Sequence, residues 1–164
     1  PDAGTLKLDA NLGRLNLVAD MGDTDGDGDL DEMVNFGARS FSIWYGNTGK
    51  IVFDSKKDVD KKTNELGTYD DKRSDDKGSE PEAVVAAKMG SQNILFVGLE
   101  RSDAFMVYDA TNPASPQYLQ TVKTGDAPEG LLFIPASKSP TKRSLLVVSS
   151  EGDGSVKIYQ PDVK

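Results

Sequence analysis

The chain has 164 residues, neither cysteine nor histidine, and 27 acidic against 19 basic residues, which gives a net charge of −8. This composition excludes disulfides, thiol nucleophiles, Ser-His-Asp triads and nearly all zinc, copper and haem ligation, so any metal here must be a hard cation held by oxygen. The negative charge opposes binding to nucleic acid or to an anionic membrane, and no apolar run approaches the ~20 residues that span a bilayer.

Short runs of β-prone residues, separated by Gly, Pro, Asn and Asp, extend along the whole chain and predict an all-β fold. The strongest runs are residues 15–19, 41–45, 50–53, 83–87, 94–99, 104–108, 131–134, 145–149 and 155–159. Segment 57–66 is charged almost all round, so we expect a short surface helix or a turn there.

Three segments repeat one pattern, a hydrophobic strand, a polar turn and a second strand that ends in an aromatic residue. They are residues 33–45, 94–108 and 145–159, and their closing tyrosines lie 63 and 51 residues apart. A Pro-Glu pair precedes two of them, with Glu82 and Glu129 47 residues apart. Periods near 50 with about four strands each are typical of propeller blades, whereas a sandwich has no reason to repeat.

We therefore predict a β-propeller segment of about three four-stranded antiparallel blades. The blade-like units are approximately residues 5–56, 78–124 and 125–164, with a polar linker at 57–77. Trp44, Tyr108 and Tyr159 should be largely buried between neighbouring blades, because only adjacent blades can cover a blade's flat faces.

A propeller closes with about four to eight blades, so three blades predict a larger closed propeller completed by something else. The chain begins Pro1-Asp2 with neither an initiator Met nor a leader, and we expect a processed part of a longer precursor. The predicted partner is therefore the remaining blades, on an N-terminal fragment of that precursor. Self-association of two halves is the alternative. We expect no nucleic-acid partner and no membrane insertion.

The sharpest local motif is a run of alternating aspartates, which predicts a Ca²⁺ site. Calcium takes six to eight oxygen ligands, and a coiled loop with a carboxylate at every second position can wrap one ion. The fifth member of the run, Asp29, would contribute its backbone carbonyl, and Gly28 permits the sharp turn. The alternative is a solvated acidic turn that binds nothing. The proposed ligands are Asp23, Asp25, Asp27, Asp29 and Asp31.

This loop is not an EF-hand, because the position of the bidentate glutamate is Val34. Residues 15–19 before the loop and 33–36 after it have strand-like patterns. We therefore expect the ion in a β-hairpin turn, in a loop similar to the calcium loops of integrin α-subunit propellers.

The repeats also predict a second carboxylate group. Equivalent blade positions in a propeller lie in a ring around the central channel, so carboxylates at equivalent strand ends would converge, with Arg101 and Arg39 nearby. Such a group would hold a cation or a polar ligand. The equal alternative is that each glutamate accepts backbone N–H bonds at a turn or pairs with an arginine. The residues are Glu82, Glu100, Glu129 and Glu151.

Several separated motifs together resemble the choice-of-anchor I family, also described as mesenchyme-specific cell-surface glycoprotein-like. The motifs lie at residues 73–82, 96–101, 106–113, 127–134 and 145–151. The resemblance, to the C-terminal half of such proteins, implies a secreted or cell-surface β-propeller. Some members are described as alkaline phosphatases or phytase-like enzymes, but the resemblance supplies no catalytic residues.

Two functions follow from these observations. The first is a Ca²⁺-binding extracellular β-propeller segment that acts as a binding or structural module. The alternative is a calcium-dependent phosphoesterase, in which cations act as Lewis acids and orient water. The enzyme needs a second, solvent-open cation cluster, whereas the module needs only the aspartate loop.

Overall fold

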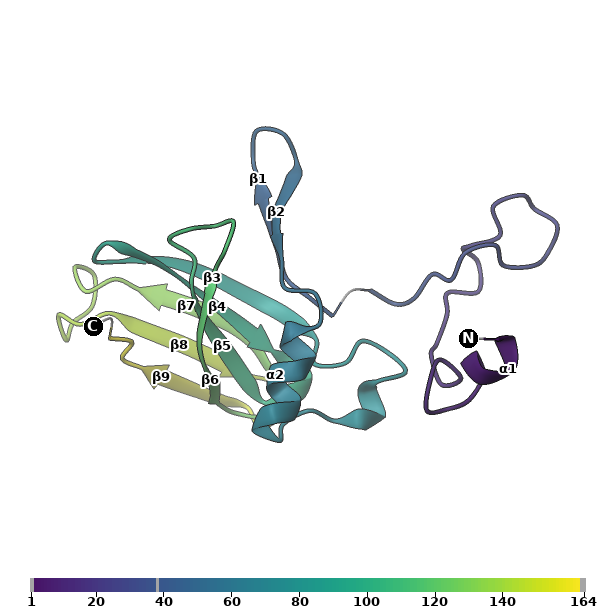
Figure 1. Cartoon of the computed structure of the whole chain (residues 1–164). Helices are drawn as coiled ribbons and strands as arrows, with labels where there is room; N and C mark the ends of the chain where they lie inside the picture. Colours follow the sequence, from purple (N-terminus) through teal and green to yellow (C-terminus); the bar gives the residue numbers. More distant parts are fainter. Residues whose placement is uncertain (1, 38, 163–164) are drawn as a thin grey trace. The chain divides into compact units, whose positions relative to one another are not determined.

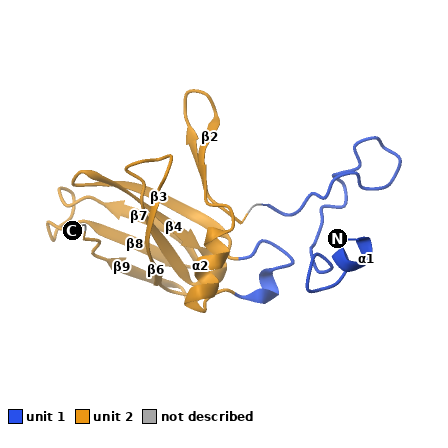
Figure 2. Ribbon diagram, in the orientation of Figure 1, with its two compact units in different colours: residues 1–38, 70–78 blue, residues 39–69, 79–164 orange. Residues whose placement is uncertain are grey.

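A computed structural model describes residues 2–37 and 39–162, in two compact units (Figure 2). Unit 1 comprises residues 1–38 and 70–78, and unit 2 comprises residues 39–69 and 79–164. The helices, labelled in Figure 1 where there is room, are α1 (Ala3–Leu6), α2 (Asp58–Leu66) and the 3₁₀ turns η1 (Asp71–Arg73) and η2 (Glu100–Ser102). The strands are β1 (Ser42–Tyr45), β2 (Lys50–Asp54), β3 (Pro81–Met89), β4 (Gln92–Leu99), β5 (Ala104–Asp109), β6 (Gln117–Lys123), β7 (Pro128–Ile134), β8 (Leu145–Ser150) and β9 (Ser155–Tyr159). None of the helices in the described part of the chain is long and apolar enough to cross a membrane.

Unit 2 holds three small antiparallel sheets, so the chain is mostly β. The strand orders are β1-β2, β3-β4-β5-β6 and β7-β8-β9, and each strand pairs with its neighbour in sequence. Such meanders need only short connections between strands. The sheet β3–β6 lies within residues 78–124 and the sheet β7–β9 within residues 125–164, whereas residues 5–56 are divided between the two units.

The two larger sheets repeat one backbone design. In each, a register shift follows the opening proline, between Pro81 and Ala83 in one sheet and between Pro128 and Gly130 in the other. In each, the residue before that proline accepts a backbone hydrogen bond from a glutamate N–H, at 3.0 Å in both. The repeat inferred from the two Pro-Glu pairs is therefore present in the backbone.

The main core lies between these two sheets. Apolar side chains of β3–β6, with Phe96 and Phe105 at the centre, pack against Leu146 and Val148 of β8. The rings of Phe96 and Phe133 stack with centroids 6.3 Å apart. Burial of each such aromatic or aliphatic side chain contributes about 1.5–3 kcal/mol to the stability of the folded state. These contacts stabilise the face-to-face packing of the two sheets.

A second cluster covers the other face of the sheet β3–β6. Val97, Leu99, Met106 and Tyr108 pack there against Val59 of α2. Helix α2 presents this residue from segment 57–66, where the sequence predicted a helix or a turn, and ends at Gly67 with φ 73°. Only glycine adopts that left-handed conformation without strain, so Gly67 is a suitable stop.

The remaining predicted strands of unit 2 are confirmed, with one addition. The sequence did not predict β6, an edge strand in which most residues are exposed and buried and exposed residues do not alternate. Edge strands carry little apolar pattern, since only one side pairs and little of the surface is covered.

Two predictions fail. Residues 15–19 and 33–36 do not form strands, but meet in one isolated bridge between Leu17 and Asn35. An isolated two-stranded pair is marginal in water, and none of the described residues of unit 1 belongs to a sheet that could extend it. Trp44 is 57% exposed, so the prediction that it is largely buried is wrong for this residue. Tyr108 is buried, but under Val59 of α2 and Phe41, and Tyr159 is only partly buried, by its packing on the main core.

Candidate functional site

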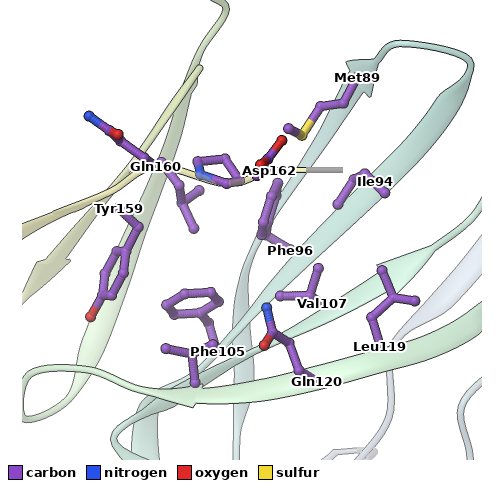
Figure 3. A pocket seen from close by; sticks show the side chains of 13 residues that line it. Met89, Ile94, Phe96, Phe105, Val107, Leu119, Gln120, Tyr159, Gln160 and Asp162 are labelled. Carbon is purple, nitrogen blue, oxygen red and sulfur yellow. The ribbon is translucent and has the colours of Figure 1, made fainter. Parts of the chain in front are cut away.

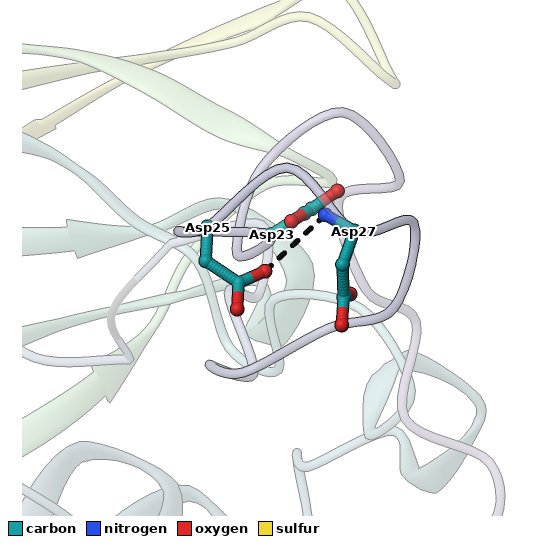
Figure 4. Close-up of side chains that lie close together, drawn as sticks. All are labelled: Asp23, Asp25 and Asp27. Carbon is teal, nitrogen blue, oxygen red and sulfur yellow. Dashed lines mark hydrogen bonds between the residues drawn. The ribbon is translucent and has the colours of Figure 1, made fainter.

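The aspartate loop of unit 1 is built by hydrogen bonds from its own backbone to its carboxylates. Asp23 accepts the N–H of Gly26 at 2.7 Å and the N–H of Gly28 at 3.0 Å. Asp25 accepts the N–H of Asp27 at 3.2 Å (Figure 4). Asp27 in turn accepts the N–H of Asp29 at 3.1 Å. Each of these hydrogen bonds joins residues two to five positions apart and so bends the backbone into a tight loop.

Three of the five predicted ligands come together. One carboxylate oxygen each from Asp23, Asp25 and Asp27 lies within 4.8 Å of the others, and all three residues are exposed. Two oxygens bound to one Ca²⁺ at 2.3–2.6 Å can be no further apart than about 5 Å, so this spacing suits a shared ion. Gly26 and Gly28, with φ of 80° and 97°, allow the tight path between them.

The end of the loop is closed differently. Asp31 accepts both the N–H of Thr24 at 2.9 Å and its hydroxyl at 2.7 Å. These hydrogen bonds hold the pKa of Asp31 below its ordinary value. Neither Asp31 nor Asp29 belongs to the carboxylate group formed by the described residues. Through these two hydrogen bonds Asp31 holds the end of the loop against Thr24.

The second candidate site is a group of glutamates in unit 2. One carboxylate oxygen each from Glu100, Glu129 and Glu151 lies within 4.8 Å of the others, and Glu100 forms a like group with Glu80 and Glu82. Glu82 and Glu129 are the second residues of β3 and β7, while Glu100 and Glu151 directly follow β4 and β8. The four glutamates singled out in the sequence therefore lie at the same end of the two sheets, where Glu100 is close to each of the other three.

Glu100 links the two groups and is the most buried of the four, with a side chain only 4% exposed. Arg101 approaches it at 2.7 Å through Nη2 and approaches Glu80 at 3.8 Å through Nε. Burial raises the pKa of Glu100 above its ordinary value, against the opposing charge of Arg101, and Glu82 and Glu80 raise it further. A bound cation or a shared proton would stabilise a carboxylate in such surroundings.

Sequence reasoning missed Glu80. Its side chain is 1% exposed and its backbone has φ 51°. A residue before proline normally adopts extended backbone, and the equivalent residue of the second repeat is Ala127, so neither local pattern nor the repeat marks it. Arg39, expected near the glutamates, contacts Asp60 at 3.5 Å and Tyr69 at 3.2 Å.

An apolar cavity lies at the other end of the same sheets (Figure 3). It has a volume of about 190 Å³, and its apolar lining includes Met89, Phe96, Phe105 and Val107. Polar side chains also line it, among them Gln120, Gln160 and Asp162. Met89 ends β3, whereas Glu82 stands near its start, so this cavity is separate from the carboxylates.

The comparisons with known proteins agree with one family. Gigasin-3a of Magallana gigas is 26% identical over 189 aligned positions, which cover 94% of this chain and 66% of that protein, slightly less than two thirds of its length. No solved structure matches significantly. The sequence profile of the choice-of-anchor I domain matches residues 1–113. The chain therefore belongs to the choice-of-anchor I family.

Proposed function

We propose that this chain is a Ca²⁺-binding segment of an extracellular β-propeller, which works as a binding or structural module. The observation that carries the proposal is the convergence of Asp23, Asp25 and Asp27 on one point of an exposed loop. Three carboxylates so close repel one another, and a divalent cation removes that repulsion. Millimolar Ca²⁺ outside cells would keep such a weak, open site filled.

The propeller part of the proposal is supported by the repeated meanders. Sheets β3–β6 and β7–β9 share a bulged opening strand, a matching turn and face-to-face packing. Radial repetition of such sheets is the architecture of a propeller. The partners proposed with it are the remaining blades, on an N-terminal fragment of the same precursor or, as the alternative, on a second copy of the chain.

Calorimetric titration tests the calcium site. We expect one Ca²⁺ per chain, with a Kd of about 0.1–1 mM, and weaker binding of Mg²⁺, which prefers a strict octahedron. At 10 mM Ca²⁺ such affinity would stabilise the folded loop by about 1.4–2.7 kcal/mol. Hydrogen exchange of residues 22–32, with calcium and with chelator, reports this directly.

The matched variants are Asp25→Asn and Asp9→Asn. Both remove one exposed carboxylate from unit 1, but only Asp25 belongs to the loop group. Asp25→Asn should weaken Ca²⁺ binding at least about tenfold and Asp9→Asn should leave it unchanged. Equal binding by both variants, or chelator-independent exchange of the loop, would refute the calcium proposal.

A second candidate function is a calcium-dependent phosphoesterase. It is favoured by the group of Glu100, Glu129 and Glu151, two of which are exposed and open to a substrate. Two or more Ca²⁺ ions held there would orient water and stabilise the charge that develops on a phosphoryl group. Hydrolysis of a phosphomonoester that needs Ca²⁺ and is lost in Glu129→Gln, but not in Asp25→Asn, would favour this enzyme over the module.

A further inference from the structure

An apolar row crosses the outward face of the sheet β7–β9. Leu132 pairs with Val147, which pairs with Ile158, so the three side chains stand side by side on one face. Leu132 is 57% exposed and Ile158 64%, and Val156 beside them is 64% exposed. We call Leu132, Val147, Val156 and Ile158 the outward face. Water solvates this face in the described chain.

The same row is buried in the other repeat. Val85 pairs with Phe96, which pairs with Val107, in the corresponding strands β3, β4 and β5. This row belongs to the main core, where the sheet β7–β9 covers it. One row of a repeated sheet is thus covered by the next sheet, and its counterpart is not.

The opposite faces establish the direction of packing. Tyr159, on the inner face of β7–β9, meets Phe105 edge-on with centroids 5.0 Å apart. Its counterpart Tyr108, on the other sheet, meets Phe41 edge-on, also at 5.0 Å. Both tyrosine-bearing faces are therefore covered by what precedes them in the chain, so the sheets stack head to tail.

We propose that the outward face binds a further antiparallel sheet of the same repeat, which presents its own tyrosine-bearing face. This inference rests on the proposed propeller and names the surface through which it continues. By the repeat, Val156 takes the place of Phe105, so an aromatic residue of the incoming sheet lies against it, and Ile158 takes the place of Val107.

The incoming sheet belongs to the same polypeptide rather than to a second copy. Three strands about 4.8 Å apart and about 20 Å long offer roughly 300 Å². A stable complex of separate chains needs about 800 Å² per partner. A face of this size holds its partner when a covalent connection raises the local concentration. The tyrosine-bearing face of β3–β6, which a second copy would have to offer, is already packed on Val59.

Thiol labelling tests the proposal, because the chain has no cysteine. Ile158→Cys and Val156→Cys place a single thiol on the outward face, and Lys157→Cys places one on the exposed opposite side of the same strand. Each variant is compared in the 164-residue chain and in the protein expressed from its complete coding sequence. We expect the first two thiols to react at least about tenfold more slowly in the complete protein, and Cys at 157 to react equally in both.

Three outcomes would overturn the proposal. Equal labelling at 158 and 156 in both proteins would mean that no sheet covers the face. Protection already present in the 164-residue chain, together with a doubled mass in light scattering, would assign the face to a second copy. Protection at 157 as well would indicate a general shielding of β9. Calcium titration of the same variants separates this result from the calcium proposal, since loss of binding with retained protection would contradict only the latter.

Discussion

Glu80 and Ala127 adopt the same left-handed backbone conformation, with φ 51° in both. Each precedes the proline that opens the first strand of its sheet, β3 or β7. Each carbonyl accepts a 3.0 Å hydrogen bond from the backbone N–H of the glutamate that follows the next strand, Glu100 or Glu151. Residues other than glycine pay about 1–2 kcal/mol for this conformation. The strained turn therefore fixes where the glutamates lie, twice in the same way.

Ala127→Gly should relieve this strain. Glycine adopts positive φ freely, but it also gains freedom in the unfolded chain, so we expect a change between zero and about 1 kcal/mol in favour of the folded state. Ala104→Gly, at a fully buried strand position, should instead lose about 1 kcal/mol. Urea unfolding monitored by circular dichroism gives both values. A loss at position 127 as large as that at 104 would contradict the strain argument.

Arg101→Gln should expose the cost of the buried carboxylates. Without the guanidinium, the carboxyl groups of Glu80 and Glu100, whose side chains are 1% and 4% exposed, lose the positive charge that lies beside them. Because Arg101 itself is 42% exposed and water screens it, we expect a loss of about 2 kcal/mol, below the full value for a buried pair. Arg143→Gln, which removes only a surface contact to Gln160, is the control and should lose less than about 0.5 kcal/mol.

The raised pKa of Glu100 predicts a pH dependence. Above the pH at which Glu100 ionises in the unfolded chain, the native state still binds its proton, so the native state holds more protons. Stability therefore falls as pH rises from the ordinary value of 4.5 through the raised pKa of Glu100.

Glu100→Gln should abolish that fall, so that the variant gains stability relative to the parent chain as pH increases above 4.5. Chemical unfolding at successive pH values, in chelator to exclude bound cations, measures the difference. Glu65→Gln, on the surface of α2, should show no such trend. A parallel curve for the two variants would mean that Glu100 is not the group responsible.

Trp44 supplies a fluorescent test of the hairpin. As the single tryptophan, with 57% of its surface exposed, it should be quenched readily by acrylamide in the folded 164-residue chain. Trp44→Ala should change the free energy of unfolding by less than about 0.5 kcal/mol. Phe41→Ala should cost about 3 kcal/mol, because that ring packs on Tyr108 and Phe53. A shielded, blue-shifted Trp44 would show that another sheet covers it.

Local pattern alone determined most of the strands of unit 2. Alternating and continuous apolar runs such as 94–99 and 104–108 can be buried only as strands of this length, and they became β4 and β5. The repeated Pro-Glu pairs were enough to align two sheets and to bring Glu82, Glu100, Glu129 and Glu151 to one sheet end. Equivalent positions of a repeat occupy equivalent places, so this information is present in the sequence.

The alternation of aspartates likewise predicted a coiled acidic loop, but not the part each residue plays. Asp27 and Asp31 both belong to the run of aspartates at every second position, so the spacing alone treats them as equivalent. Asp31 accepts two hydrogen bonds from Thr24, whereas Asp27 turns toward Asp23 and Asp25. The choice depends on which donor the closed loop brings within reach, and spacing alone does not specify that.

Tertiary structure alone decided the burial of charges and of faces. Glu80 is as polar as Glu129 in the sequence, yet a left-handed turn buries one beside Arg101 and leaves the other exposed. Trp44 is the last residue but one of its segment and Tyr108 is the last of a similar one, but only Tyr108 is buried. Likewise, Phe96 and Val147 occupy equivalent strand positions, but Phe96 is buried in the main core and Val147 is only partly buried.

The sequence determines which residues can share a face, because side-chain direction alternates along a strand. Whether that face meets water or another sheet depends on contacts between segments far apart in the chain.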